Sequence, residues 1–194
     1  MGKLLKKLFY ALLICYFLYS CVYHRITHLS SDELEWVTNR KVGEIMYFKS
    51  QFGEVDTVEI FDIKVHNSLS PFNFAYFNTS NQEYIAYGDM SYSFKNKKES
   101  SYGNFSIAKN YNDKPIEFSG VLFSRWTFDV PLKLTSLRIH KLTLDDVVIF
   151  DNSNLEPPHN KSQKKVMSYA WSKKYGLVQY TFQDGTVFTR IGIK

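Results

Sequence analysis

The sequence predicts a mainly β fold, with antiparallel strands arranged as a sandwich or a curved half-barrel and one short N-terminal helix. Two observations lead to this fold class. From residue 44 onward, apolar residues recur with a period of two in runs rich in Tyr, Phe, Ile and Val. Polar turn residues separate these runs, and one segment carries the start signal of a helix. The spacing of the runs predicts about ten short strands.

The helix is predicted over residues 31–38. Ser30 stands three residues before Glu33, which is the spacing of a capping box, and Leu34 and Trp36 follow as apolar positions. Asn39 and Gly43 end the helix.

The predicted strands follow one another to the end of the chain. Their ranges are Glu44–Ser50, Val55–Val65, Phe74–Asn78, Tyr84–Phe94, Tyr102–Lys109, Ile116–Phe128, Leu132–Ile139, Leu142–Phe150, Val166–Ser172, Leu177–Phe182 and Val187–Ile193.

Two hairpin turns are predicted between these strands. Residues 51–54 connect the first pair, and Asp184-Gly185 connects the last pair. Asp-Gly between two β-rich runs favours a tight turn in which both central residues adopt positive φ. Residues 96–100 and 110–115 are predicted loops. Residues 151–164, with Pro157-Pro158, form the longest predicted loop and are expected to be disordered.

The charge of the chain is concentrated in its first residues. The chain has 24 Lys and Arg against 19 Asp and Glu, and Lys3, Lys6 and Lys7 lie ahead of an apolar run. Without residues 1–20, 21 basic and 19 acidic residues remain. The basic pI is therefore mostly a property of the leader and does not support binding to nucleic acid.

Residues 1–20 have the pattern of a secretory signal peptide. The three lysines form a positive n-region, and Leu8–Leu18 supplies an apolar h-region of eleven residues. The alternative is an uncleaved anchor that spans the membrane, although the apolar stretch is shorter than the roughly 20 residues that such a helix needs.

Cys21 is the predicted site of lipid attachment. Leu18-Tyr19-Ser20-Cys21 places a small residue directly before the cysteine and an aliphatic residue two places earlier. Cys15 follows a bulky residue inside the h-region, so it is a poor alternative. After cleavage Cys21 is the lone cysteine, and acylation explains it better than a free thiol that forms dimers. We expect residues 21–30 to be a tether and residues 31–194 to form a single antiparallel β-domain.

Several segments resemble small Bacteroidetes-type cell-envelope lipoproteins of uncharacterised function. The similar segments are Leu34–Val37 with Gly43-Glu44, Phe48–Ser50, Gly53 and Asp56-Thr57, then Leu142–Asp151 and Trp171–Tyr180 with Asp184-Gly185. The resemblance implies a location in the cell envelope and a β fold. It implies no activity, because these families are uncharacterised. The curved sheet is also similar to lipoprotein carriers that hold lipid between a half-barrel and helices, but this chain offers one short helix for such a cavity.

Candidate chemical sites are few. No Gly-x-Ser-x-Gly motif occurs, so no catalytic residue is assigned. His24 and His28 are four residues apart, but they lie in the tether without a third ligand, so no metal site is predicted. Asp145 and Asp146 should face opposite sides of a strand. Thr57, in Asp56-Thr57-Val58, matches a short acceptor pattern for O-glycosylation of exported Bacteroidetes proteins.

The expected function is non-enzymatic binding or scaffolding at the cell envelope by a lipid-anchored protein. Two alternatives remain open: a carrier or binding protein for an apolar or glycan ligand, and a hydrolase without a recognisable motif. We expect no cofactor and no nucleic-acid partner; the membrane is the expected partner through the N-terminal lipid, and a protein or glycan partner is unidentified. Residues 22–25 lack an acidic residue, so we expect an outer-membrane lipoprotein that faces the periplasm.

Overall fold

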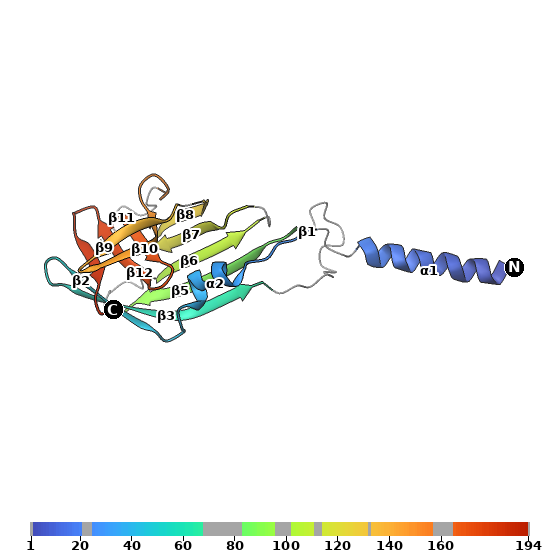
Figure 1. Cartoon of the computed structure of the whole chain (residues 1–194), viewed down its shortest axis with the longest axis horizontal. Helices are drawn as coiled ribbons and strands as arrows, with labels where there is room; N and C mark the ends of the chain where they lie inside the picture. The colour runs from blue at the N-terminus through green and yellow to red at the C-terminus, as the bar shows by residue number, and fades with distance from the viewer. Residues whose placement is uncertain are drawn as a thin grey trace.

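Among the residues that the structure describes, the main element is an antiparallel sheet of eleven strands. The computed structural model describes residues 2–20, 25–67, 83–95, 102–110, 114–131, 133–156 and 165–193. In space the strands run in the order β8-β7-β6-β5-β3-β2-β13-β12-β11-β10-β9 (Figure 1). Their bounds are β2 Ile45–Ser50, β3 Val55–His66, β5 Ala86–Phe94, β6 Tyr102–Lys109, β7 Glu117–Leu122, β8 Arg125–Val130, β9 Thr135–Ile139, β10 Leu142–Phe150, β11 Val166–Ser172, β12 Gly176–Phe182 and β13 Val187–Arg190. The predicted mainly β fold is confirmed.

In the part of the chain that the structure describes, two helices lie outside this sheet. Helix α1 (Gly2–Ser20) contains the leader and extends away from the β-domain, and α2 (Ser31–Thr38) lies against the sheet (Figure 1). Among the described residues, neither helix combines the length and apolarity that crossing a membrane requires.

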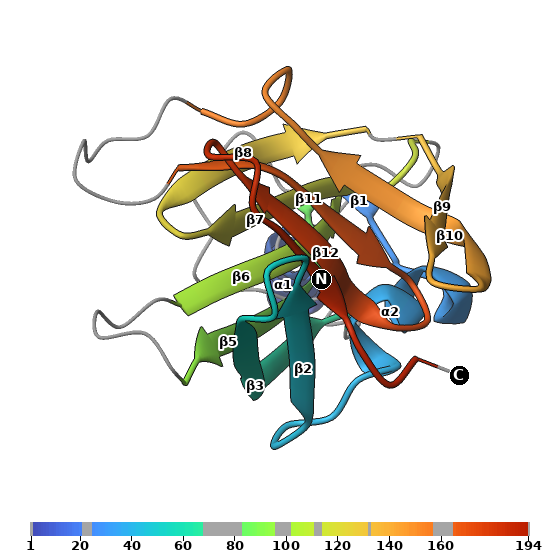
Figure 2. The ribbon, with the colours of Figure 1, turned by 90° about the vertical axis from the view of Figure 1, so that its left-hand side faces the viewer.

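The sheet curls so that strands far apart in its order face each other. The rings of Phe105 in β6 and Trp171 in β11 stack with their centroids 4.0 Å apart. At the edge of the sheet, the guanidinium of Arg125 in β8 donates to the main-chain carbonyl of Val166 in β11. Figure 2 shows β5–β8 and β10–β12 on opposite sides of the curl. Of the two predicted architectures, the structure has the curved half-barrel.

The inside of the curl is filled with side chains, most of them aromatic. Strand β2 shows the alternation that produces this filling, because every second residue is buried. The largest fully buried side chains are Trp171, Tyr92, Tyr169, Tyr180, Phe48, Phe105, Phe150, Phe182, Met46, Ile60, Met90 and Ile107. The inner face of the sheet is therefore a packed core.

Helix α2 begins and ends as predicted and packs against the core. Ser30 and Glu33 form the capping box, with Ser30 Oγ accepting from Glu33 N at 3.2 Å and Glu33 Oε2 accepting from Ser30 N at 2.7 Å. Trp36 and Val37 are buried. Lys109 at the end of β6 donates to Glu33 Oε1 at 2.8 Å. Burial opposes the charged form of Glu33, but hydrogen bonds from Lys109 and Ser30 outweigh it and lower the pKa of this carboxyl.

Residues 25–30 of the predicted tether contact the β-domain. Residues Arg25–Ile26 form a short strand, β1, that pairs in parallel with β4 (Glu83–Tyr84). Leu29 is 3% exposed and belongs to the core cluster. The side chain of Asn67 holds the main chain of Leu29 in both directions, because it accepts from Leu29 N and donates to Leu29 O, each at 2.8 Å. Residues 25–30 of the predicted tether are therefore packed against the β-domain.

Most predicted strands are confirmed, and the range Ile116–Phe128 is wrong. It contains two strands, β7 and β8, joined by a two-residue turn at Phe123 and Ser124, both of which have positive φ (47° and 61°). A non-glycine residue is uncommon in this region of backbone space. Phe123 is partly buried, and its ring packs on Phe94 at a centroid distance of 4.4 Å; this contact helps to offset the backbone cost.

Smaller differences concern strand ends. The strand predicted over Leu132–Ile139 begins at Thr135, and the one predicted over Val187–Ile193 ends at Arg190. The predicted strand Phe74–Asn78 and the second half of the predicted loop 151–164 lie outside the described residues.

The hairpin at Asp184-Gly185 is confirmed, but the predicted turn geometry is wrong. Of these two residues, Gly185 alone has positive φ, at 80°. Gly185 N donates to Phe182 O at 3.0 Å, and Phe182 N donates to Thr186 O at 2.9 Å, which makes a three-residue connection. Asp184 Oδ1 accepts from Thr186 N at 2.9 Å, so the aspartate stabilises the turn with its side chain.

Replacing Gly185 with Val should destabilise this hairpin. A Cβ at this position meets no atom within 4 Å, so the expected cost comes from the positive φ alone. A β-branched residue resists this conformation, and we expect a loss of about 1–2 kcal/mol in the free energy of unfolding. Thermal unfolding followed by circular dichroism measures the loss, with Gly185→Asn as the milder control. An unchanged melting temperature for the valine variant would contradict the role of the turn.

Candidate functional site

The two residues predicted to carry modifications have different surroundings. Cys21 lies outside the described residues, so its acylation stays a prediction. Thr57 lies in β3, half-buried and opposite Tyr47 of β2, and its glycosylation also stays a prediction. The neighbouring Asp56 is buried on the inner face, where it accepts a hydrogen bond from Tyr180. Burial and then the charge of Asp56 raise the pKa of Tyr180 far above its usual value, which keeps the phenol protonated.

The histidines occupy separate places in the structure. His24 lies outside the described residues, His28 Nδ1 is 3.1 Å from Asn67 Oδ1, and His66 stacks on Tyr87. Within the described parts of the chain, no three potential metal ligands come together.

Asp145 and Asp146 point to different partners, as their adjacency on a strand predicts. Asp145 Oδ1 accepts from Ser136 Oγ at 2.5 Å, whereas both carboxylate oxygens of Asp146 lie 3.0 Å from Ser172 Oγ. Asp146 thereby stabilises the turn between β11 and β12.

The aromatic segments named from the sequence divide between the core and the surface. Residues 72–76 lie outside the described residues. In the segment Tyr84–Phe94, Tyr92 and Phe94 are buried in the core and Tyr87 is exposed on the outer face. The aromatic side chain that lines a pocket is that of Trp126, which the sequence analysis did not single out.

A pocket of about 260 Å³ lies on the outer face of β6, β7 and β8. Asn104 and Ser106 alternate with the buried Phe105 and Ile107, and therefore point away from the core. Trp126, which is 44% exposed, contributes an aromatic side chain to the wall. The full lining is Asn104, Ser106, Ser119, Gly120, Val121, Trp126 and Thr127. We call this the outer pocket.

Hydrogen bonds fix the polar side chains of the outer pocket. Asp89 of β5 lies next to Asn104 and Ser106 on the outer face, and its Oδ1 accepts from Asn104 Nδ2 at 2.7 Å and from Ser106 Oγ. Ser106 Oγ also lies 3.0 Å from Asn104 Oδ1. Asp89 Oδ2 has no hydrogen-bond partner among the residues that the structure describes. The amide and the hydroxyl are thus oriented before any ligand binds.

The strand that carries Trp126 is held in place by the residue before it. The Arg125 side chain is buried and donates to the carbonyl oxygens of Leu155 at 3.3 Å, Glu156 at 3.0 Å and Val166. Burial lowers the pKa of Arg125, because it disfavours the charged guanidinium and none of these three acceptors is a carboxylate. These bonds fix β8 against the segment after β10 and against β11.

An irregularity in the β7–β8 ladder lies next to Gly120 and Thr127 in the lining of the outer pocket. The register shifts between Phe118 and Gly120, so that β8 carries an extra residue at this point. A Cβ on Gly120 would lie 2.7 Å from Tyr169 Oη, so glycine is needed for the close approach of β7 to β11. Tyr169 Oη lies 3.4 Å from Thr127 Oγ1, and burial raises the pKa of Tyr169.

Comparisons with protein-family models, with curated proteins and with solved structures found no match to this chain. The chemistry of the outer pocket follows from its own atoms. It offers hydroxyl and amide groups that both donate and accept, one carboxylate beside them and an indole ring. These groups suit a small polar ligand that has an apolar face.

Sequence reasoning missed this pocket because it treated Ile116–Phe128 as a single strand. In one strand, Val121 and Trp126 would lie on opposite faces, because their separation is an odd number of residues. The turn at Phe123-Ser124 instead places Trp126 directly opposite Val121. The signal that was available is the pair of outward positions Asn104 and Ser106 within the aromatic run of β6.

Proposed function

We propose that this chain is a lipid-anchored protein of a bacterial cell envelope, and that its β-domain binds a partner without catalysing a reaction. The observation that carries the proposal is the order of its first segments. A positive n-region and an apolar h-region end at Leu18-Tyr19-Ser20-Cys21, and the packed domain begins at Arg25. In this proposal the lipid, including palmitate, is attached to Cys21.

The filled interior favours binding at the surface over carriage inside the sheet. A carrier for an apolar ligand needs a cavity, typically about 300–1,000 Å³ in volume. The inner face of this sheet is occupied by fully buried aromatic rings such as Phe105, Trp171 and Tyr180. The outer pocket faces solvent and combines the polar side chains of Asn104, Ser106 and Ser119 with the apolar surface of Val121 and Trp126, which supports a binding or scaffolding role.

Replacing Cys21 with Ser tests the anchor. We expect the variant to lose metabolic labelling with an alkyne-palmitate probe and to leave the membrane fraction, or to accumulate as an unprocessed precursor. Cys15→Ser is the matched control, because Cys15 is the other cysteine of the chain and is exposed on α1. The control should be labelled and retained like the natural protein. Normal processing of Cys21→Ser with continued membrane association would show that the apolar run is a true span.

The proposed location is the outer membrane, with the β-domain facing the periplasm. Residues 22–25 carry no acidic residue that could serve as a surface-export signal or as an inner-membrane retention signal. Protease added to intact cells should leave the domain uncut, as it leaves a periplasmic control protein uncut. Digestion of the domain while the control survives would place it on the cell surface.

A further inference from the structure

The outer pocket belongs to a longer polar strip that crosses five strands. Residues that lie opposite one another on neighbouring strands form two parallel rows of side chains on the outer face. The two rows are two residues apart along each strand. The rows are Asp62, Ser91, Asn104, Val121 and Trp126, and Lys64, Asp89, Ser106 and Ser119. Neighbouring strands are about 4.8 Å apart, so the strip is about 19 Å long. We call it the outer strip.

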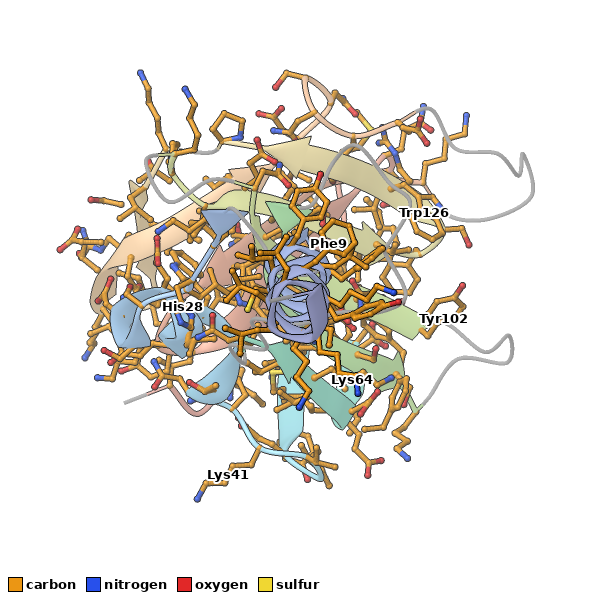
Figure 3. The ribbon with its side chains drawn as sticks, turned by 90° about the vertical axis from the view of Figure 1, so that its right-hand side faces the viewer. Phe9, His28, Lys41, Lys64, Tyr102 and Trp126 are labelled. Atoms are coloured by element: carbon orange, nitrogen blue, oxygen red, sulfur yellow. The ribbon has the colours of Figure 1, made fainter. Side chains whose placement is uncertain are left out.

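Exposed aromatic rings border the outer strip. Trp126 ends the first row, and Tyr102 stands two residues before Asn104 on the same face of β6, with 55% of its surface exposed. Figure 3 shows Trp126 and Tyr102 on the same side of the molecule. Tyr87 stands two residues before Asp89 and is also exposed. Rings of this kind offer flat apolar surfaces next to hydrogen-bonding groups.

The charges on the outer strip are nearly balanced. Lys64 Nζ lies 2.7 Å from Asp62 Oδ2, so the lysine is engaged with a neighbour in the strip. Asp89 adds one negative charge, and the lining of the outer pocket contains no cationic side chain. This arrangement disfavours phosphate, nucleic acid and acidic polymers, because their charges would meet the Asp89 carboxylate, and Lys64, which lies opposite Asp89, is already paired with Asp62.

We infer that the outer strip binds a neutral oligosaccharide, with one sugar ring in the outer pocket against Trp126. The inference rests on the proposed binding function and names its ligand class. A sugar ring has an apolar C–H face that packs on an indole. Its hydroxyls both donate and accept, which matches the amide of Asn104, the hydroxyl of Ser119 and the acceptor lone pairs of Ser106, whose proton goes to Asp89. Asp89 Oδ2, which accepts no hydrogen bond from the described residues, supplies a further acceptor beside the pocket.

The size and the rigidity of the outer pocket agree with this ligand. Its volume of about 260 Å³ suits a single ring and lies below the range of pockets for larger apolar ligands. The bonds among Asp89, Asn104 and Ser106, and those that Arg125 makes, hold the site in one arrangement without a ligand. Preorganised hydrogen-bonding groups lose little entropy when a ligand binds.

Binding to defined sugars tests the inference on the full chain in detergent. The probes are the neutral hexasaccharides of glucose, mannose, xylose and N-acetylglucosamine, with oligogalacturonate as the anionic probe, measured by calorimetry and tryptophan fluorescence. We expect at least one neutral probe to bind and oligogalacturonate not to bind. Trp126→Ala should weaken that binding about tenfold or more, and Asn104→Ala should weaken it as well.

Phe52→Ala is the matched control, because Phe52 is an exposed ring at the β2–β3 turn, away from the strip, with 74% of its surface accessible. The control should bind like the natural protein, and Trp126→Phe should recover part of the affinity. The inference is overturned if no neutral probe binds at up to about 10 mM, if oligogalacturonate alone binds, or if Trp126→Ala binds as well as Phe52→Ala. A negative result with intact palmitate labelling at Cys21 would refute the sugar site and leave the anchored location standing.

Discussion

Trp171→Ala should lower the free energy of unfolding by about 3–5 kcal/mol. Trp171 is fully buried, and its ring stacks on Phe105 with an interplanar angle of 2°. The pair joins β11 to β6 across the inside of the curl, and Tyr92 packs on the same indole at a centroid distance of 5.7 Å. Alanine would leave a large cavity at the place where the two sides of the sheet meet.

Trp171→Phe is the control for this prediction. The indole Nε1 of Trp171 is buried without a hydrogen-bond partner among the described residues, so phenylalanine removes no hydrogen bond. The phenylalanine variant should retain the stack on Phe105. It should lower the free energy of unfolding by less than half as much as the alanine variant does. Urea denaturation of the three proteins gives the comparison. A loss below about 1 kcal/mol for the alanine variant would mean that the core does not depend on this contact.

Gly103→Ala should lower the free energy of unfolding by about 3 kcal/mol, which is the upper end of the usual cost of overpacking a core. Gly103 of β6 lies directly opposite Tyr92 of β5, and the tyrosine ring covers the glycine. A Cβ at this position would be 2.1 Å from Tyr92 Cε2 and 2.4 Å from Cζ. The ring is fully buried, so it has no free space into which it could move.

A double-mutant cycle separates this clash from other effects of the substitution. In a Tyr92→Leu background the shorter side chain frees the space above residue 103, so Gly103→Ala should become much less costly. The expected coupling between the two positions is at least about 1 kcal/mol. Equal costs in both backgrounds would show that backbone entropy, and not the ring, makes glycine necessary.

Local patterns predicted those elements whose signals lie within a few residues. The reciprocal bonds of Ser30 and Glu33 need only a spacing of three, and α2 has the predicted bounds. Tyr102–Lys109 and Leu142–Phe150 also have the predicted bounds, since alternation along a strand reports which face is buried.

The features that sequence reasoning missed depend on distant partners. The turn at Phe123 and Ser124 contains none of the residues that favour positive φ, and contacts such as that with Phe94 stabilise it. Leu29 is held by Asn67, 38 residues later in the chain, and no local sequence pattern predicts that contact. The outer pocket was missed with the turn, because Trp126 faces Val121 only after the chain reverses.

The packed start of the domain also limits how far the protein can reach. If Cys21 carries the lipid, three residues separate the anchor from Arg25, and the four residue-to-residue steps of an extended chain span about 14 Å. The domain would then stay in a thin layer at the membrane surface. The domain could not reach partners that are fixed away from this membrane surface. It would encounter molecules of the same leaflet by lateral diffusion, at a high effective concentration. Weak binding would be sufficient in such a layer, and inserting a flexible linker after residue 22 should extend the range of partners at the expense of that local concentration.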